Sequence, residues 1–84
     1  MPVPHGYSEG AVDFLVCYKG HYLAIETKVH PRKATTLQLK FLAEVHKAGG
    51  SAALAYDLEE VHLALSHIED GTTWLSAEIE PWID

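Results

Sequence analysis

The sequence has few of the features that would set it apart from ordinary globular domains. It contains one cysteine, Cys17, so an intramolecular disulfide is excluded and a reducing compartment is expected. No apolar run approaches the roughly 18 residues of a membrane span, and the first residues lack a signal-peptide pattern. With 84 residues, 48% of them hydrophobic, we expect one cytoplasmic domain covering residues 1–84 and no membrane partner.

Basic residues are missing from the second half of the chain. Residues 49–84 carry eight acidic and no basic side chains, a net charge of −8, whereas residues 1–48 carry six basic and four acidic ones, a net charge of +2. The total of −6 argues against nucleic acid as a partner, because its backbone attracts Lys and Arg. The uneven distribution, however, predicts a polarised molecule with one basic region.

Residues 1–11 hold two Pro and two Gly and are predicted to be an irregular lead-in. Two strands are then expected, "VDFLVCY" (12–18) and "HYLAIET" (21–27), joined by a turn at Lys19-Gly20.

A helix is predicted from "TTLQ" to Ala48, because Thr35 and Gln38 have capping-box spacing and Gly49-Gly50 suit a helix end. "SAALAYD" (51–57) is expected to be a buried strand, and "LEEVHLALSHI" (58–68) a second helix whose buried stripe is Leu58, Val61 and Leu65. The tail, residues 72–84, suits a final strand or a dimer contact, and its two Trp indicate docking onto the core or a partner. The order ββαβα predicts an α/β fold with a mixed sheet.

The hairpin contains two carboxylates in otherwise apolar strands. With a two-residue turn at Lys19-Gly20, paired residue numbers sum to 39, so Asp13 and Glu26 stand opposite each other with Cβ atoms about 5 Å apart. Lys28 points to the same face, because side chains alternate along a strand. A three-residue turn would shift this register and remove the pairing.

Opposed carboxylates repel, and a divalent cation between them would remove that cost. Mg²⁺ or Mn²⁺ accepts one or two carboxylates together with water and phosphate oxygens, and a nearby Lys28 ammonium can stabilise charge on a phosphate. The alternative is a solvated Asp13 and an ordinary ion pair between Lys28 and Glu26. No zinc-ligand spacing is present among the six histidines and Cys17.

"VD" followed after a hairpin by "ETK" resembles the core motif of the PD-(D/E)XK nucleases. More narrowly, the ordered set resembles the virus-type replication-repair nuclease (VRR-NUC) family, most of all its short phage stand-alone members, over roughly residues 8–56. The set consists of Gly10, Asp13, Glu26, Lys28, Gln38 and Gly49-Gly50.

This resemblance implies a Mg²⁺- or Mn²⁺-dependent DNA endonuclease acting on branched DNA such as four-way junctions, in the host cytoplasm if the protein is viral. Asp13 and Glu26 would be metal ligands with the Thr27 carbonyl, and Lys28 the catalytic lysine. Gln38 would lie beside the site, a role compatible with helix capping.

Other residues extend or depart from this pattern. Arg32, Lys33 and Lys40 follow Lys28 and are candidate phosphate contacts, or simply a solvated basic surface. The family's N-terminal helix, which adds an acid in many members, has no room here, and Glu9 is the only upstream acid.

A missing helix would leave one sheet face poorly covered. Together with the short chain and the dimeric short members of the family, this predicts a homodimer. Two competing functions stay open: an inactive nucleic-acid-binding module of the same fold, and an acidic protein that binds a basic protein partner.

Overall fold

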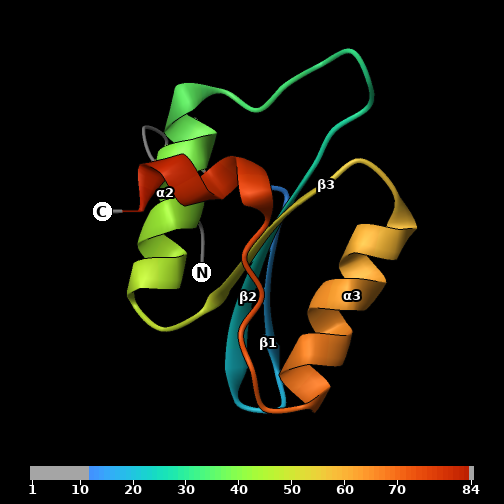
Figure 1. Ribbon diagram of the computed structural model, residues 1–84, viewed down its shortest axis with the longest axis vertical. Coiled ribbons are helices and arrows are strands. Elements are labelled where there is room, and N and C mark those ends of the chain that lie inside the picture. Colours follow the sequence, from blue (N-terminus) through green and yellow to red (C-terminus); the bar gives the residue numbers. More distant parts are fainter. Residues whose placement is uncertain (1–11, 84) are drawn as a thin grey trace.

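The computed structural model describes residues 12–83, and the predicted α/β fold with a mixed sheet is confirmed (Figure 1). Strand β2 is central, pairing antiparallel with β1 and parallel with β3. The elements in chain order are β1 (Phe14–Tyr18), β2 (His21–Thr27), α2 (Thr36–Lys47), β3 (Ser51–Ala55), α3 (Leu58–Glu69) and a 3₁₀ helix, η1 (Ala77–Trp82).

The hairpin between β1 and β2 has the predicted register. Phe14 pairs with Ile25 and Tyr18 with His21, so paired numbers sum to 39. The turn is possible because Lys19 and Gly20 both adopt positive φ, 51° and 80°, which is the backbone of a type I′ turn. The two-residue turn therefore fixes which strand residues oppose each other.

Helix α2 begins and ends where its capping residues predicted, and α3 has a cap that the sequence did not predict. Thr35 and Gln38 form a reciprocal capping box at the start of α2, and Gly49 follows its end with φ 104°. Asp57 caps α3 by accepting a hydrogen bond from the Glu60 N–H at 3.2 Å.

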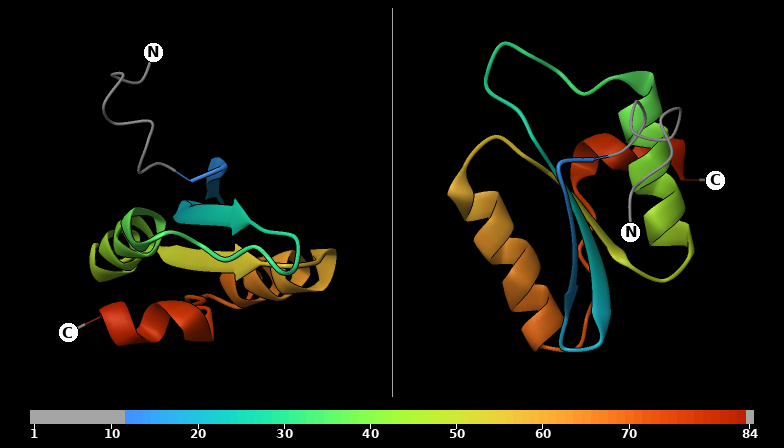
Figure 2. Two further views of the ribbon diagram at one scale, coloured as in Figure 1. Left: turned by 90° about the horizontal axis from the view of Figure 1, so that it is seen from above. Right: turned by 180° about the vertical axis from the view of Figure 1, so that it is seen from behind.

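The sheet has helices on both faces, so the expectation of one poorly covered face is wrong. Figure 2 shows α2 and η1 on one side of the sheet and α3 on the other. Each face has its own apolar cluster: Ala24, Leu42 and Ile79 belong to the first, and Leu23, Ile25 and others to the second. Strand β1, at the outer edge, is the part of the sheet that stays exposed.

The buried stripe of α3 differs in one position from the prediction. Val61 and Leu65 pack against the core as expected, but Leu58 is 73% exposed. The fully buried side chains of α3 are instead Ala64 and Ile68. Leu58 is the first residue of the helix, where the chain has only begun to run along the sheet.

The tail does not form the predicted final strand. Leu75 makes a single parallel bridge to Ala52, after which the chain enters η1. Both Trp side chains pack onto the core. Trp74 packs against the apolar cluster on the α3 face of the sheet, and Trp82 against the cluster on the α2 face. A single bridge suffices here because side chains make the remaining contacts between the tail and β3.

The predicted lead-in, with Glu9 and Gly10, lies outside the described residues. Within residues 12–83, no helix has the length and apolar character needed to cross a membrane.

Candidate functional site

The candidate site lies at the open end of the hairpin. Asp13 immediately precedes β1, while Glu26 and Thr27 end β2 and Lys28 follows. Because the ladder ends with Phe14 paired to Ile25, its next position along the strands places residue 13 beside residue 26. The structure brings these side chains into one hydrogen-bonded group.

Asp13 is held in place by Thr27, the residue after Glu26. Its Oδ2 accepts hydrogen bonds from the Thr27 hydroxyl at 2.6 Å and the Thr27 backbone N–H at 3.0 Å. These two bonds lower the pKa of Asp13 below its ordinary value of 3.8. The side chain is otherwise exposed, so it is an ionised carboxylate at neutral pH that water and ions can reach.

Glu26 is buried, unlike Asp13. Only 2% of the residue is exposed, and a buried carboxylate requires partners. Its Oε2 lies 3.1 Å from the Lys28 Nζ, and its Oε1 accepts a hydrogen bond from the Asp13 backbone N–H at 3.2 Å. Lys28 is itself anchored, because its backbone N–H donates to the Ala55 carbonyl at 2.9 Å. The pair is thus fixed at the end of the sheet.

The donor set suits a hard cation of the magnesium type. Asp13 and Glu26 adjoin here through the hydrogen bond from the Asp13 N–H to the Glu26 Oε1, and the Thr27 carbonyl faces the same strand edge as the Thr27 N–H, the side on which Asp13 lies. Mg²⁺ takes one or two carboxylates and completes its shell with water and substrate oxygens. No group of three or more His, Cys, Asp or Glu occurs in the described part of the chain, so a metal here would keep several non-protein ligands.

Gln38 acts as a capping residue in the structure. Its Oε1 accepts a hydrogen bond from the Thr35 N–H at 2.9 Å, and its own N–H donates to the Thr35 hydroxyl at 3.1 Å. It makes no hydrogen bond to Asp13 or Glu26. A role beside the site stays a prediction.

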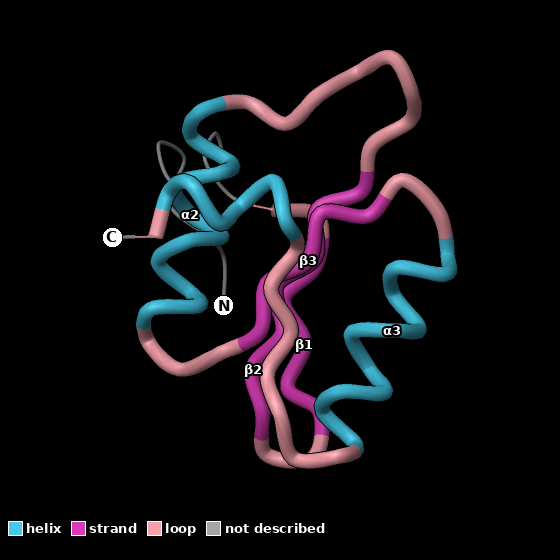
Figure 3. Tube along the Cα trace, in the orientation of Figure 1, coloured by secondary structure: helices cyan, strands magenta, loops and turns pink. Residues whose placement is uncertain are grey.

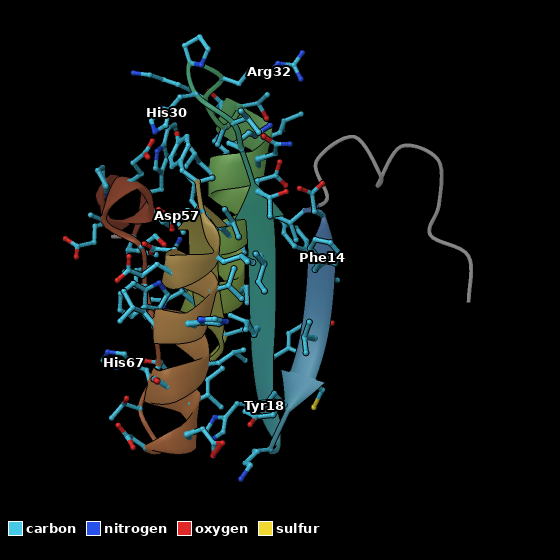
Figure 4. The ribbon with its side chains drawn as sticks, turned by 90° about the vertical axis from the view of Figure 1, so that its right-hand side faces the viewer. Phe14, Tyr18, His30, Arg32, Asp57 and His67 are labelled. Carbon is cyan, nitrogen blue, oxygen red and sulfur yellow. The ribbon has the colours of Figure 1, made fainter. Side chains whose placement is uncertain are left out.

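The basic residues proposed to contact phosphate lie on the surface near this end of the molecule. Arg32 and Lys33 are exposed in the loop of residues 28–35, and Lys40 is exposed on α2 (Figure 3). None of the three forms an ion pair within residues 12–83. Figure 4 shows Arg32 at the end of the molecule opposite Tyr18, the end at which the hairpin opens.

An aromatic pair that the sequence did not predict lies beside this loop. The rings of His30 and Tyr56 stack with centroids 4.2 Å apart. A hollow of about 230 Å³ is lined there by Lys28, Val29 and Leu58, among others. No local signal could have identified the pair, because its members lie on different segments that only the sheet brings together.

Comparison with known proteins gives this site no counterpart. No family model, curated protein or solved structure matches the chain. The resemblance to the VRR-NUC family therefore stays a prediction from the sequence.

Proposed function

We propose that this protein is a metal-dependent DNA endonuclease of the PD-(D/E)XK type, selective for branched DNA such as four-way junctions. The observation that carries the proposal is the grouping of Asp13, Glu26 and Lys28. A buried carboxylate with a lysine 3.1 Å away and a second, ionised carboxylate beside it is an arrangement that a metal-assisted phosphodiesterase needs.

Each residue has a distinct role in the proposed reaction. Asp13, Glu26 and the Thr27 carbonyl would hold Mg²⁺ or Mn²⁺, which when bound acts as a Lewis acid on phosphate and lowers the pKa of a coordinated water. The Lys28 ammonium would donate to a phosphate oxygen and stabilise the negative charge that develops on it. The Thr27 hydroxyl orients Asp13 through its 2.6 Å hydrogen bond.

The surroundings of the site fit an anionic polymer better than the total charge suggests. Arg32 and Lys33 are exposed in the loop that continues from Lys28, with no acidic partner in the described structure. The described acidic residues of the second half belong to α3, to its two capping positions and to η1. DNA would therefore approach at the open end of the hairpin, where Arg32, Lys33 and Lys40 would contact its phosphates.

A cleavage assay with three DNA forms tests the proposal. Labelled duplex, single-stranded and four-way-junction DNA is incubated with the protein in Mg²⁺, Mn²⁺ or EDTA. We expect cleavage of the junction in either metal, none in EDTA, and a loss of at least about 100-fold in the Lys28→Ala and Asp13→Asn variants.

The matched control is Lys19→Ala, which removes the hairpin lysine whose Nζ lies 3.0 Å from Glu69 of α3. It should cleave like the wild type. Equal cleavage by Lys28→Ala and Lys19→Ala would contradict the assignment. DNA binding without cleavage in any metal would favour the inactive binding module, and binding of neither DNA nor metal would favour the acidic interaction protein.

A further inference from the structure

The two edges of the sheet differ in whether anything covers them. At the β3 edge, the Ala52 N–H donates to the Trp74 carbonyl at 3.0 Å, and the Ser76 N–H donates to the Ala52 carbonyl at 3.1 Å. The Ser76 hydroxyl also accepts from the Leu54 N–H at 2.9 Å. The tail thus satisfies the polar backbone of this edge.

At the β1 edge, the outward backbone groups have no such cover. Tyr18 and His21 flank the turn as a hydrogen-bonded pair, so every second residue, Leu15 and Cys17, turns its N–H and C=O away from β2. No backbone hydrogen bond joins these groups to any residue of the described segment. Figure 4 shows β1 at the outer edge of the sheet.

The side chains of β1 do not protect this edge. Natural edge strands are blocked by charges, Pro or bulges, and "FLVCY" has neither a charge nor a Pro. Phe14 is 55% exposed, Leu15 47% and Tyr22, on the neighbouring strand, 51%. Beside them, an apolar groove of about 300 Å³ runs between the hairpin and α2, where Leu15, Tyr22 and Phe41 line it.

We infer that β1 pairs with β1 of a second copy of this chain, in an antiparallel register centred on Val16. Leu15 of one copy then exchanges both hydrogen bonds with the partner's Cys17, and the same pair forms again across the two-fold axis. All five residues of β1 are paired, because Phe14 and Tyr18 are equally far from Val16. The two sheets become one sheet of six strands.

Charge favours a second copy at this edge over other places on the surface. Two chains of net charge −6 repel each other, and the described acids of the second half lie on α3, its caps and η1, with Glu69 paired to Lys19 at the turn end of β1. In the register centred on Val16, two uncharged β1 strands face each other, and Asp13 of one copy lies opposite the partner's Lys19 at each end of the pairing.

This pairing also has a consequence that rests on the proposed function. The axis stands perpendicular to the sheet, so both Asp13 side chains lie on the same face of it. They are separated by six positions along the strands, roughly 20 Å at about 3.4 Å per residue. Such a dimer would present two candidate sites to one branched DNA molecule.

The mass in solution tests the pairing without any measurement of cleavage. Sedimentation and light scattering should give twice the chain mass of 9.3 kDa for the full chain. The double variant Leu15→Lys/Cys17→Lys opposes lysines across the axis and should be a folded monomer by circular dichroism. The matched control, Leu63→Lys/Ser66→Lys, alters an exposed leucine on α3, 43% exposed, and should remain a dimer.

Disulfide cross-linking tests the register. In Val16→Cys/Cys17→Ser, the two new thiols face each other with Cα atoms about 4.5 Å apart, within disulfide reach, and mild oxidation should cross-link the dimer. In the wild type, Cys17 and the partner's Cys17 are diagonal at about 7–8 Å and should not cross-link.

A monomeric full chain at all concentrations, or a dimer that survives the double lysine substitution, would overturn the inference. Cross-linking through Cys17 alone would overturn the register. A dimer without nuclease activity would leave the pairing intact and remove only the proposed function.

Discussion

The two ends of the β1–β2 hairpin carry similar groups in different surroundings. At the turn end, the Lys19 Nζ lies 3.0 Å from the Glu69 Oε1, and the Tyr18 hydroxyl donates to the Glu69 Oε2 at 2.8 Å. Both charged side chains are about half exposed, 57% for the lysine and 46% for the glutamate. Water screens such a pair, so its geometry alone indicates little stabilisation.

At the open end, the pair of lysine and carboxylate is buried, and an exposed hydroxyl and one more acid lie beside it. The Glu26 side chain is 3% exposed and the Lys28 side chain 16%. The hydroxyl, from Thr27, is bonded to a second carboxylate, Asp13. Burial makes the Glu26 and Lys28 charges depend on each other, and the exposed Asp13 is the second carboxylate of the candidate cation site.

A lysine 3 Å from a glutamate is therefore not by itself evidence for a functional site. Removing the partner of an exposed charge leaves that charge in water. Removing the partner of a buried charge leaves it uncompensated. Substitutions at the two ends should therefore differ, so variants at the turn end are matched controls for variants at the open end.

The largest expected effect is on stability in Lys28→Ala. This variant leaves the Glu26 carboxylate buried without its cation, at a cost of roughly 3 kcal/mol in the free energy of unfolding. Urea denaturation at pH 7 measures it, with Lys19→Ala expected to unfold close to the wild type. Equal losses of stability in the two variants would show that burial does not make the Glu26–Lys28 pair more important to stability than the Lys19–Glu69 pair.

A smaller effect is expected from the metal. If Asp13 and Glu26 hold Mg²⁺, the ion stabilises the folded chain by about 2.7 kcal/mol at 100 times its Kd. Thermal unfolding with increasing Mg²⁺ should show a rising Tm in the wild type and in Glu69→Gln, and none in Asp13→Asn. A Tm that rises equally in both variants would place the metal elsewhere.

The hairpin and the helix ends could be predicted because their signals are local. A positive φ at Lys19 and Gly20 sets the register, and the Thr35–Gln38 spacing sets the start of α2. By counting, that register places residue 13 next to residue 26, although the ladder itself ends at Phe14 and Ile25 and Asp13 lies outside β1. What makes the group a candidate site, namely the burial of Glu26, depends on α2 and β3 packing around it and was not available from the pattern.

The tail could not be predicted for a related reason. Its alternating residues suit a strand, but distant side chains determine its path. The Trp74 indole donates to the Glu60 Oε2 at 3.0 Å, and the Ser76 hydroxyl donates to the same oxygen at 2.6 Å. The Trp74 N–H donates to the Ser51 hydroxyl at 2.9 Å. These partners lie 14 to 23 residues away, outside any local window.

The smallest expected effect is a change in acid titration in Thr27→Val. The Thr27 hydroxyl makes the largest contribution to the lowered pKa of Asp13, so the variant should return that pKa part of the way toward 3.8, with the Thr27 N–H bond retained. NMR titration of the Asp13 carboxyl carbon measures the change. Tyr18→Phe should instead raise the lowered pKa of Glu69. The rise should be partial, because Lys19 lowers that pKa more than Tyr18 does, and the pKa of Asp13 should not change.

The same hydrogen bond makes stability depend on pH in a defined direction. Because the pKa of Asp13 is lower in the folded chain, its carboxylate contributes stability that is complete above the unfolded value of 3.8 and is lost as the pH falls through the folded pKa. The Tm of Thr27→Val should therefore lie below the wild-type Tm near neutral pH. The difference should shrink below pH 3.8. A difference that stays constant into strong acid would mean that the hydroxyl acts through packing and not through the charge of Asp13.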